Sequence, residues 1–239
     1  MTVVALTAIG VGSATAVGAL IGFFTGKISE NGRNAVMGFA AGMMLAAACV
    51  GLVIPAVDLT GLKGLWQVAL GFFAGAAFLN LADRLMPHAH TDKLTRKAGL
   101  FVAAIAIHNF PEGLASGVGF ATGNTGGAIA LALGIALQNI PEGMIIIAPL
   151  MFSGMKKSKA LIISMCTGLF EVAGTFIGYF AASASRIMLP FSLSFAAGMM
   201  IFVIADEMIP ETHSGENGLI SSFALVAGFM LMLLLDCVF

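Results

Sequence analysis

The chain has 239 residues, of which 59% are hydrophobic and only 10% are charged, whereas a typical soluble domain is about 45–50% apolar and about 25% charged. This composition excludes a disordered chain and an ordinary soluble domain. The formal net charge of −1 gives no basic surface for nucleic acid, and the three cysteines form no CxxC pair of the kind found in zinc ribbons and redox proteins.

Apolar stretches long enough to cross a membrane recur along the whole chain, because a spanning helix needs about 20 apolar residues. The predicted spans are residues 3–26, 35–57, 64–86, 98–121, 127–152, 160–184, 189–209 and 218–238. These eight spans take up most of the sequence. We therefore expect an all-α polytopic membrane protein with one transmembrane domain over residues 1–239.

The basic residues predict the orientation of these spans. Nine of the 11 Lys and Arg residues fall on one side of the predicted membrane, and only Lys63 and Arg186 fall on the other. Because Lys and Arg in short loops stay cytoplasmic, both termini are predicted to lie outside. The link between the last two spans contains no Lys or Arg, so hydropathy alone places the last hairpin.

The sequence also contains an internal repeat. The hexapeptide Phe-Ala-Ala-Gly-Met-Met occurs at residues 39–44 and again at 195–200, an offset of 156. Residues of the first span match the sixth at the same offset, so spans 1–3 are predicted to recur, inverted, as spans 6–8 in a 3+2+3 arrangement. Inverted repeats are common in secondary transporters, whose substrate sites lie near the midplane. Chance similarity among glycine-rich helices is the alternative.

The fourth and fifth spans share a second pattern, [His/Gln]-Asn-x-Pro-Glu-Gly, which begins at His108 and at Gln138. His108 and Glu112 are four residues apart and share a helix face, as do Gln138 and Glu142. Proline inside a helix removes a backbone hydrogen bond and bends the chain where a ligand can approach. Hydrogen bonding between helices, or a purely structural kink, is the alternative for each residue alone.

Three glutamates, Glu112, Glu142 and Glu171, lie well inside predicted spans, where one charge costs about 2.5–3.5 kcal/mol. No Lys or Arg lies at matching depth, so cations from outside, or protons, must neutralise them. One imidazole, one amide and two carboxylates suit zinc, iron, manganese or a similar divalent ion. Asn109 and Asn139 point about 100° away from the preceding residues, His108 and Gln138. With Glu171 they could form a second, oxygen-rich site, and the glutamates could bridge the two sites.

With these residues the chain resembles the ZIP (Zrt/Irt-like protein) metal transporters, most closely the bacterial GufA-type branch. The paired signature, the eight spans, the outside termini and the 3+2+3 arrangement all match. The resemblance implies uptake of divalent metal, chiefly Zn²⁺, toward the cytoplasm. It also implies a bacterial inner membrane protein that forms a homodimer.

The resemblance also implies two ligand sets. One metal would be held by His108, Glu112, Gln138 and Glu142, with Met44 nearby. A second would be held by Asn109, Asn139, Glu142 and Glu171, with Glu112 bridging. Many relatives have histidine at the position of Gln138, and an amide oxygen binds late transition metals less well than imidazole. Transport of Fe²⁺, Mn²⁺ and Cd²⁺ is therefore expected beside that of zinc.

Candidate residues for entrance and exit lie near the ends of the spans. Asp58 ends the second span on the outer side and resembles the entrance acid of the family. The predicted cytoplasmic ends of the third and seventh spans carry Asp83, His88, His90, Asp206, Glu207, Glu211 and His213. A metal leaving the midplane would meet these donors, among which the resemblance favours Glu207 and those at the end of the third span. Solvated polar helix ends are the alternative.

Two other functions account for less of the sequence. An intramembrane metal-dependent hydrolase would need a second deep histidine in an HExxH motif, and a metal sensor would normally carry a soluble signalling domain. The sequence contains neither feature, nor the GxxxxGK[ST] motif of an ATP site. We therefore predict a transporter rather than an enzyme, with divalent metal ions and the lipid bilayer as its partners.

Overall fold

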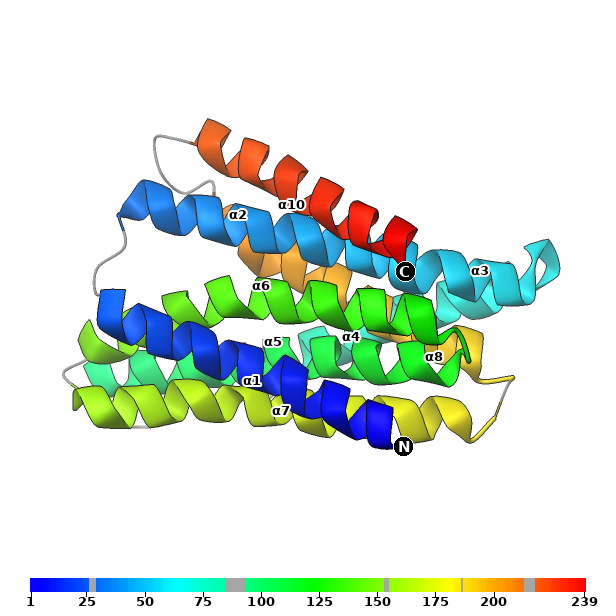
Figure 1. Ribbon diagram of the computed structural model, residues 1–239, viewed down its shortest axis with the longest axis horizontal. Helices are drawn as coiled ribbons and strands as arrows, with labels where there is room; N and C mark the ends of the chain where they lie inside the picture. The colour runs from blue at the N-terminus through cyan, green and yellow to red at the C-terminus, as the bar shows by residue number, and fades with distance from the viewer. Residues whose placement is uncertain (26–28, 85–92, 153–154, 186, 213–217) are drawn as a thin grey trace.

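The computed structural model describes residues 1–25, 29–84, 93–152, 155–185, 187–212 and 218–239, and they form an all-helical bundle (Figure 1). The elements are α1 (Thr2–Thr25), α2 (Glu30–Ala46), η1 (Ala47–Val53), α3 (Ile54–Thr60), η2 (Leu62–Gly64), α4 (Leu65–Arg84), α5 (Lys93–Ala121), α6 (Thr125–Phe152), α7 (Lys157–Ser183), α8 (Leu189–Val203), η3 (Ile204–Met208), α9 (Ile209–Thr212) and α10 (Gly218–Val238). Both termini lie at the same end of the bundle.

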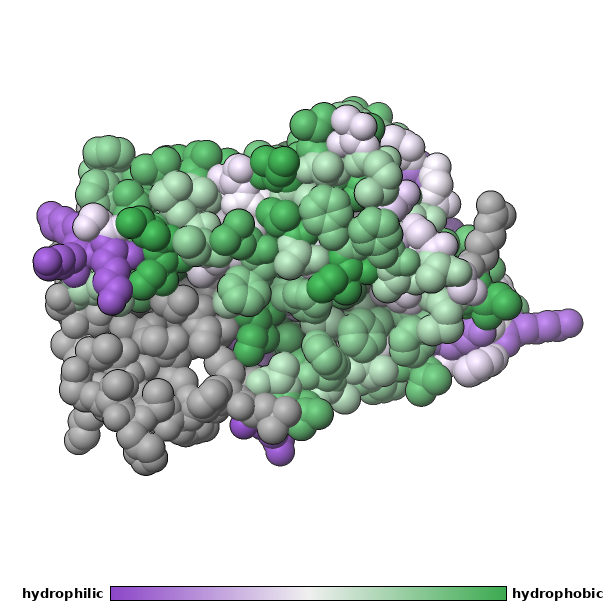
Figure 2. Space-filling model, turned by 90° about the horizontal axis from the view of Figure 1, so that it is seen from below, coloured by the Kyte–Doolittle hydropathy of each residue, from purple (hydrophilic) through white to green (hydrophobic). Residues whose placement is uncertain are grey.

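Among the described residues, seven helical stretches are long and apolar enough to cross a membrane. The 29-residue helix α5 matches the remaining predicted span but is not among these seven, so the count of eight spans stays a prediction. Large apolar side chains such as Leu6, Phe73, Leu169 and Phe223 are exposed on the outside of the bundle. Figure 2 shows a broad apolar surface, with hydrophilic residues gathered mainly toward the two ends of the long axis. This surface is typical of a protein that sits in lipid.

The helices form two groups. In the first, α5 packs on α7, and α1 packs on both α6 and α7. In the second, α2 packs on α10 and α4 packs on α8. The groups meet where α8 contacts α5 and where α2 contacts α6, and the main apolar core, which includes Met44, Leu131 and Met199, fills this junction.

Equivalent glycine contacts recur at the offset of the repeat. Gly12 of α1 and Gly168 of α7 are 156 residues apart, and a Cβ atom on either would collide with the carbonyl oxygen of the other. The second group shows the same relation, because Gly42 lies against the backbone of Leu225 and Gly198, its mate, lies against Phe72. We keep the inverted 3+2+3 repeat as the proposal that accounts for these paired contacts.

Two π-helices interrupt the long stretches that match the second and seventh predicted spans. η1 ends just before Ile54-Pro55, and η3 ends just before Ile209-Pro210. Because proline has no N–H and its ring crowds the carbonyl group four residues earlier, the preceding turn widens. In η3 this wider turn carries Asp206 and Glu207.

A tight hairpin sets the two motif helices side by side. Gly123, between α5 and α6, has a φ of 84°, a conformation that favours glycine. The next residue, Asn124, accepts a hydrogen bond from the backbone N–H of Gly127 at 3.2 Å and so caps the start of α6. The reversal makes α5 and α6 antiparallel neighbours, which brings their motifs together in the interior.

Candidate metal centre

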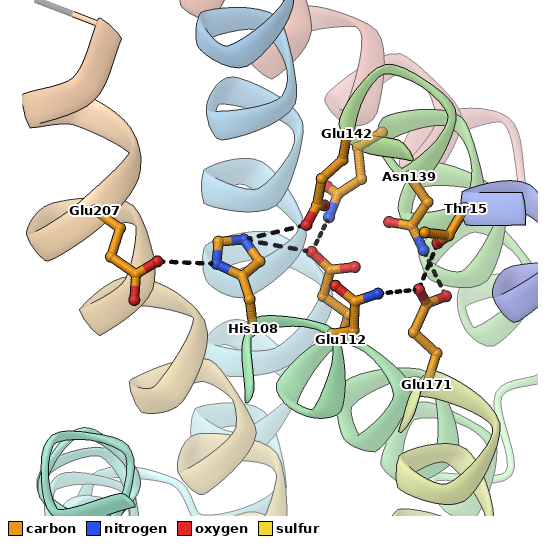
Figure 3. Close-up of polar contacts among 9 residues, drawn as sticks. Thr15, His108, Glu112, Asn139, Glu142, Glu171 and Glu207 are labelled. Atoms are coloured by element: carbon orange, nitrogen blue, oxygen red, sulfur yellow. Dashed lines mark hydrogen bonds and ion pairs between the residues drawn. The ribbon is translucent and has the colours of Figure 1, made fainter. Parts of the chain in front are cut away.

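The motif residues of α5 and α6 meet at one point inside the first group of helices (Figure 3). Ligand atoms of His108, Glu112 and Glu142 all lie within 4.8 Å of one another. The Nε2 atom of His108 is 4.0 Å from Oε1 of Glu112 and 3.9 Å from Oε1 of Glu142. Ligands about 2.0–2.2 Å from a tetrahedral zinc ion are about 3.3–3.6 Å apart. A small inward movement of these side chains would therefore close the set around an ion.

Gln138 belongs to the same cluster. Its side chain is fully buried, and its amide Nε2 donates a hydrogen bond of 2.7 Å to Oε1 of Glu112. The amide hydrogens point toward the Glu112 carboxylate. Among the described residues, no lysine or arginine forms an ion pair with this carboxylate. Rotation of the amide would present its oxygen instead, the atom that binds metal ions.

A second cluster surrounds Glu171 of α7. Its carboxylate is fully buried and accepts hydrogen bonds from Nδ2 of Asn109 at 2.8 Å, from Nδ2 of Asn139 at 2.6 Å and from Oγ1 of Thr15 at 2.5 Å. The four residues come from α5, α6, α1 and α7, so each helix of the first group contributes one side chain. Asn109, Asn139 and Glu171 were predicted site residues, whereas Thr15 was not.

Both clusters contain buried oxygen atoms that accept no hydrogen bond from any described residue. They are Oε2 of Glu112 and Glu142, Oε1 of Gln138, and Oδ1 of Asn109 and Asn139. A buried acceptor without a donor costs about 1–3 kcal/mol, and more when it is charged. Five such atoms close together need a partner, and a divalent cation bound by carboxylate and amide oxygens would supply it. The donor set therefore fits a metal ion.

The structure also describes Met44 and Glu207 of the predicted set. Met44 is fully buried and belongs to the apolar core cluster of α2, α6 and α8. Glu207, which we expected at the cytoplasmic end, lies with Oε2 3.7 Å from Nδ1 of His108 (Figure 3). Its side chain is 41% exposed, so Glu207 joins the buried cluster to the surface of the bundle.

Of the other exit candidates, one is described. His88, His90 and His213 lie outside the described residues, as do the side chains of Asp83 and Glu211. Asp206 is described and exposed, next to Glu207 in η3. These residues therefore stay predictions.

The entrance candidate, Asp58, is exposed and lines a cavity of about 450 Å³. The same cavity is lined by Asp236 near the end of α10, which the sequence argument missed. Its signal was present, since an acid that close to the end of an apolar span needs a polar partner or water. Leu131 also lines the cavity and belongs to the main core with the fully buried Ile135, so apolar side chains separate this cavity from the clusters.

Comparison with known proteins supports the membrane and family assignments. Residues 86–236 match the family described as ZIP Zinc transporter. The chain is 38% identical to the zinc transporter GufA of Myxococcus xanthus, with 94% of each protein covered. It is 37% identical to the zinc transporter ZIPB of Bordetella bronchiseptica, covering 94% of this chain and 77% of the relative. It is 30% identical to human zinc transporter ZIP11, with 93% of each covered.

These relatives are transporters rather than enzymes, and the predicted resemblance, including the GufA-type relative, is confirmed. Together with the apolar helices, they make this an integral membrane protein of a metal ion transport family. The chain belongs to the ZIP zinc transporter family.

Proposed function

We propose that this protein carries divalent transition metal ions, chiefly zinc, toward the cytoplasm through a two-metal site near the middle of the membrane. One observation carries the proposal: ligand atoms of His108, Glu112 and Glu142 lie within 4.8 Å of one another in the interior of an apolar bundle. Imidazole and carboxylate groups are common zinc ligands. The names of the relatives, all zinc transporters, agree with this chemistry.

The unpaired oxygens support the following ligand sets. The first ion is held by His108, Glu112, Gln138 and Glu142, with Met44 nearby. The second is held by Asn109, Asn139, Glu142 and Glu171, with Glu112 bridging the two ions. Because one ligand of the first ion is the amide oxygen of Gln138, selectivity is relaxed, and iron, manganese and cadmium are carried as well.

The proposed path begins outside at the cavity that contains Asp58 and Asp236. Two carboxylates there attract hydrated cations. Along α6 the buried Leu131 and Ile135 lie between the cavity and Gln138, whereas Glu207, which is 41% exposed, lies beside His108. The ion leaves past Glu207 and the polar residues at the cytoplasmic ends of the third and seventh spans. The protein lies in a bacterial inner membrane with both termini outside.

The test is zinc-65 influx into proteoliposomes. His108→Ala and Glu142→Ala each remove a ligand, so we expect influx to fall by at least tenfold, as is usual for loss of a metal-site group. Ser164→Ala is the matched control, because Ser164 is fully buried but donates only to the carbonyl oxygen of Ala160 in its own helix. Unlabelled iron, manganese and cadmium added to the same assay would measure selectivity.

Influx by the parent protein that Ser164→Ala preserves and both ligand variants lose supports the proposal. Equal influx by His108→Ala, Glu142→Ala and the parent would overturn the site. No zinc influx by the parent would overturn the function itself.

A further inference from the structure

The Glu171 carboxylate is held by three neutral donors, and one of them has no place in the ligand sets proposed above. Asn109 and Asn139 donate from the motif helices, while Thr15 donates from α1. Thr15 is 1% exposed, and its Oγ1 lies 2.5 Å from Oε1 of Glu171. In Figure 3 this hydroxyl points at the Glu171 carboxylate and lies next to Asn139.

The direction of this hydroxyl is a departure from the common pattern. A threonine inside a helix usually bonds a backbone carbonyl three or four residues earlier in its own helix. Thr175 does so, since it is fully buried and donates to the backbone carbonyl of Glu171 at 2.9 Å. Thr15 instead crosses from α1 to α7 and contacts the carboxylate. A hydrogen bond to an ionised acceptor is about twice as strong as one between neutral groups.

Thr15 and Glu171 are also equivalent positions of the repeat, because they are 156 residues apart. The same offset relates Gly12 and Gly168, which touch each other one turn away. In a two-fold arrangement a residue touches its own mate only close to the axis. The axis of the proposed inverted repeat would therefore pass between α1 and α7 at Thr15 and Glu171.

Contact across such an axis limits which residues can stand there. Two glutamates would press two carboxylates together in a medium of low dielectric constant, and one of them would lose its charge. Two threonines would supply no charge for a cation. One acceptor and one donor satisfy both requirements, which gives a physical reason why the repeat diverges at this pair of positions.

We propose that Thr15 is the positioning residue of the second metal site: its hydroxyl fixes the Glu171 carboxylate so that it faces Asn109 and Asn139. This inference rests on the proposed function, because it concerns a ligand of that transport site. Without the hydroxyl only the amides of Asn109 and Asn139, themselves ligands of the second ion, hold the carboxylate. Its orientation is then less fixed, so the second ion binds more weakly while the first set, which Thr15 does not touch, keeps its ion.

The first test measures zinc binding by the detergent-solubilised protein with titration calorimetry, and zinc-65 influx in proteoliposomes. Thr15→Val keeps the shape of the side chain but removes the donor, and Thr15→Ser keeps the donor. We expect Thr15→Val to lower the affinity for the second zinc ion by about tenfold and to raise the KM for influx, with the affinity for the first ion unchanged. Thr15→Ser should restore both. Thr175→Val, the matched control, should behave as the parent.

The second test exchanges the pair. Glu171→Thr alone should lose the second ion, and Thr15→Glu alone should place two carboxylates in contact. The double variant Thr15→Glu/Glu171→Thr restores one donor and one acceptor in the opposite direction. Asn109 and Asn139 are themselves equivalent positions of the motif pair, so the reversed carboxylate meets the same two amides. We expect the double variant to bind the second zinc ion more tightly than Glu171→Thr.

The outcomes separate this inference from the proposed function. A parent that binds no zinc or transports none overturns the function, whatever Thr15 does. A parent that binds two ions while Thr15→Val matches it in second-site affinity and KM overturns the role of Thr15. The same conclusion follows if Thr15→Val and Thr175→Val lose affinity equally, or if the double variant binds no better than Glu171→Thr. A melting temperature recorded for each variant identifies loss of folding.

Discussion

Glu112 is a deeply buried acid of the candidate site with little compensation from its neighbours. Its side chain is fully buried, Oε1 accepts one hydrogen bond from Gln138, and Oε2 accepts none from the described residues. Removing one partner of a buried charge leaves a large desolvation cost, which a bound cation offsets and a neutral side chain avoids. The stability of the protein should therefore depend on metal through this residue.

Glu112→Gln tests this dependence. In the presence of a chelator we expect the variant to unfold at a higher temperature than the parent, because the buried carboxyl group, which without metal must stay uncompensated or take up a proton, is gone. Zinc at 100 times its Kd should stabilise the parent by about 2.7 kcal/mol and the variant much less. Thermal unfolding in detergent measures both effects. Glu30→Gln, at an exposed position in the first turn of α2, is the control for the loss of a charge. A chelator-treated variant that melts below the parent would contradict the argument.

Some contacts of single residues could be predicted from the sequence and others could not. The four-residue spacing correctly predicted that His108 and Glu112 share a face, and their ligand atoms lie together. The contact of Glu207 with His108 could not be predicted, because Glu207 lies in a π-helix whose wider turn changes the face on which each side chain points. The Asp58–Asp236 cavity likewise joins residues from distant helices, which spacing along one helix does not reveal.

At the scale of helices, glycine contacts determine how closely α1 and α7 approach. A Cβ on Gly12 would collide with the carbonyl oxygen and carbon of Gly168 and with the side chain of Val172, whereas a Cβ on Gly10 would meet nothing within 4 Å. The two positions lie two residues apart on one helix, so they form a matched pair. Close contact between helix backbones is what stabilises helix association in lipid.

Gly12→Ala should therefore lower the stability by about 1–3 kcal/mol, the usual cost of overpacking, and should impair the second site by forcing α1 away from α7. Gly10→Ala should be neutral or slightly stabilising, since alanine favours a helix more than glycine does. Thermal unfolding in detergent and zinc influx provide the two measurements. Equal effects of the two substitutions would show that the α1–α7 contact does not hold the site together.

The extents of the helices were the easiest feature to predict, because each depends on a continuous apolar run. The predicted span 3–26 is α1 at Thr2–Thr25, and the predicted span 218–238 is α10 at Gly218–Val238. The prolines of the Ile54-Pro55 and Ile209-Pro210 pairs predict a disturbed turn, yet neither proline distinguishes a kink from the π-helices that form there. Which of the two forms depends on whether the neighbouring helices can pack against the extra residue in a π-helical turn.

At the scale of the whole molecule, the repeat offset could be read from the sequence, but its consequence could not. The hexapeptides at 39–44 and 195–200 relate α2 to α8 without showing which residues meet at the axis. Contact between Thr15 and Glu171 depends on the close packing of α1 and α7, a tertiary feature. The offset of 156 makes Thr15 and Glu171 equivalent positions, and their contact in the structure supplies a reason why the two residues differ.

The conformation of the whole molecule predicts that its two ends are accessible from opposite sides of the membrane. Asp236 lines one cavity, Glu207 lies beside the buried His108, and Ile135 is fully buried. In a variant whose three native cysteines are replaced by serine, Asp236→Cys should react with a membrane-impermeant thiol reagent added to intact cells. Glu207→Cys should react only after permeabilisation, and more slowly with zinc present. Ile135→Cys should stay unlabelled in both cases. Labelling of Glu207→Cys in intact cells would reverse the proposed orientation, in which the Lys and Arg distribution predicts that this end faces the cytoplasm.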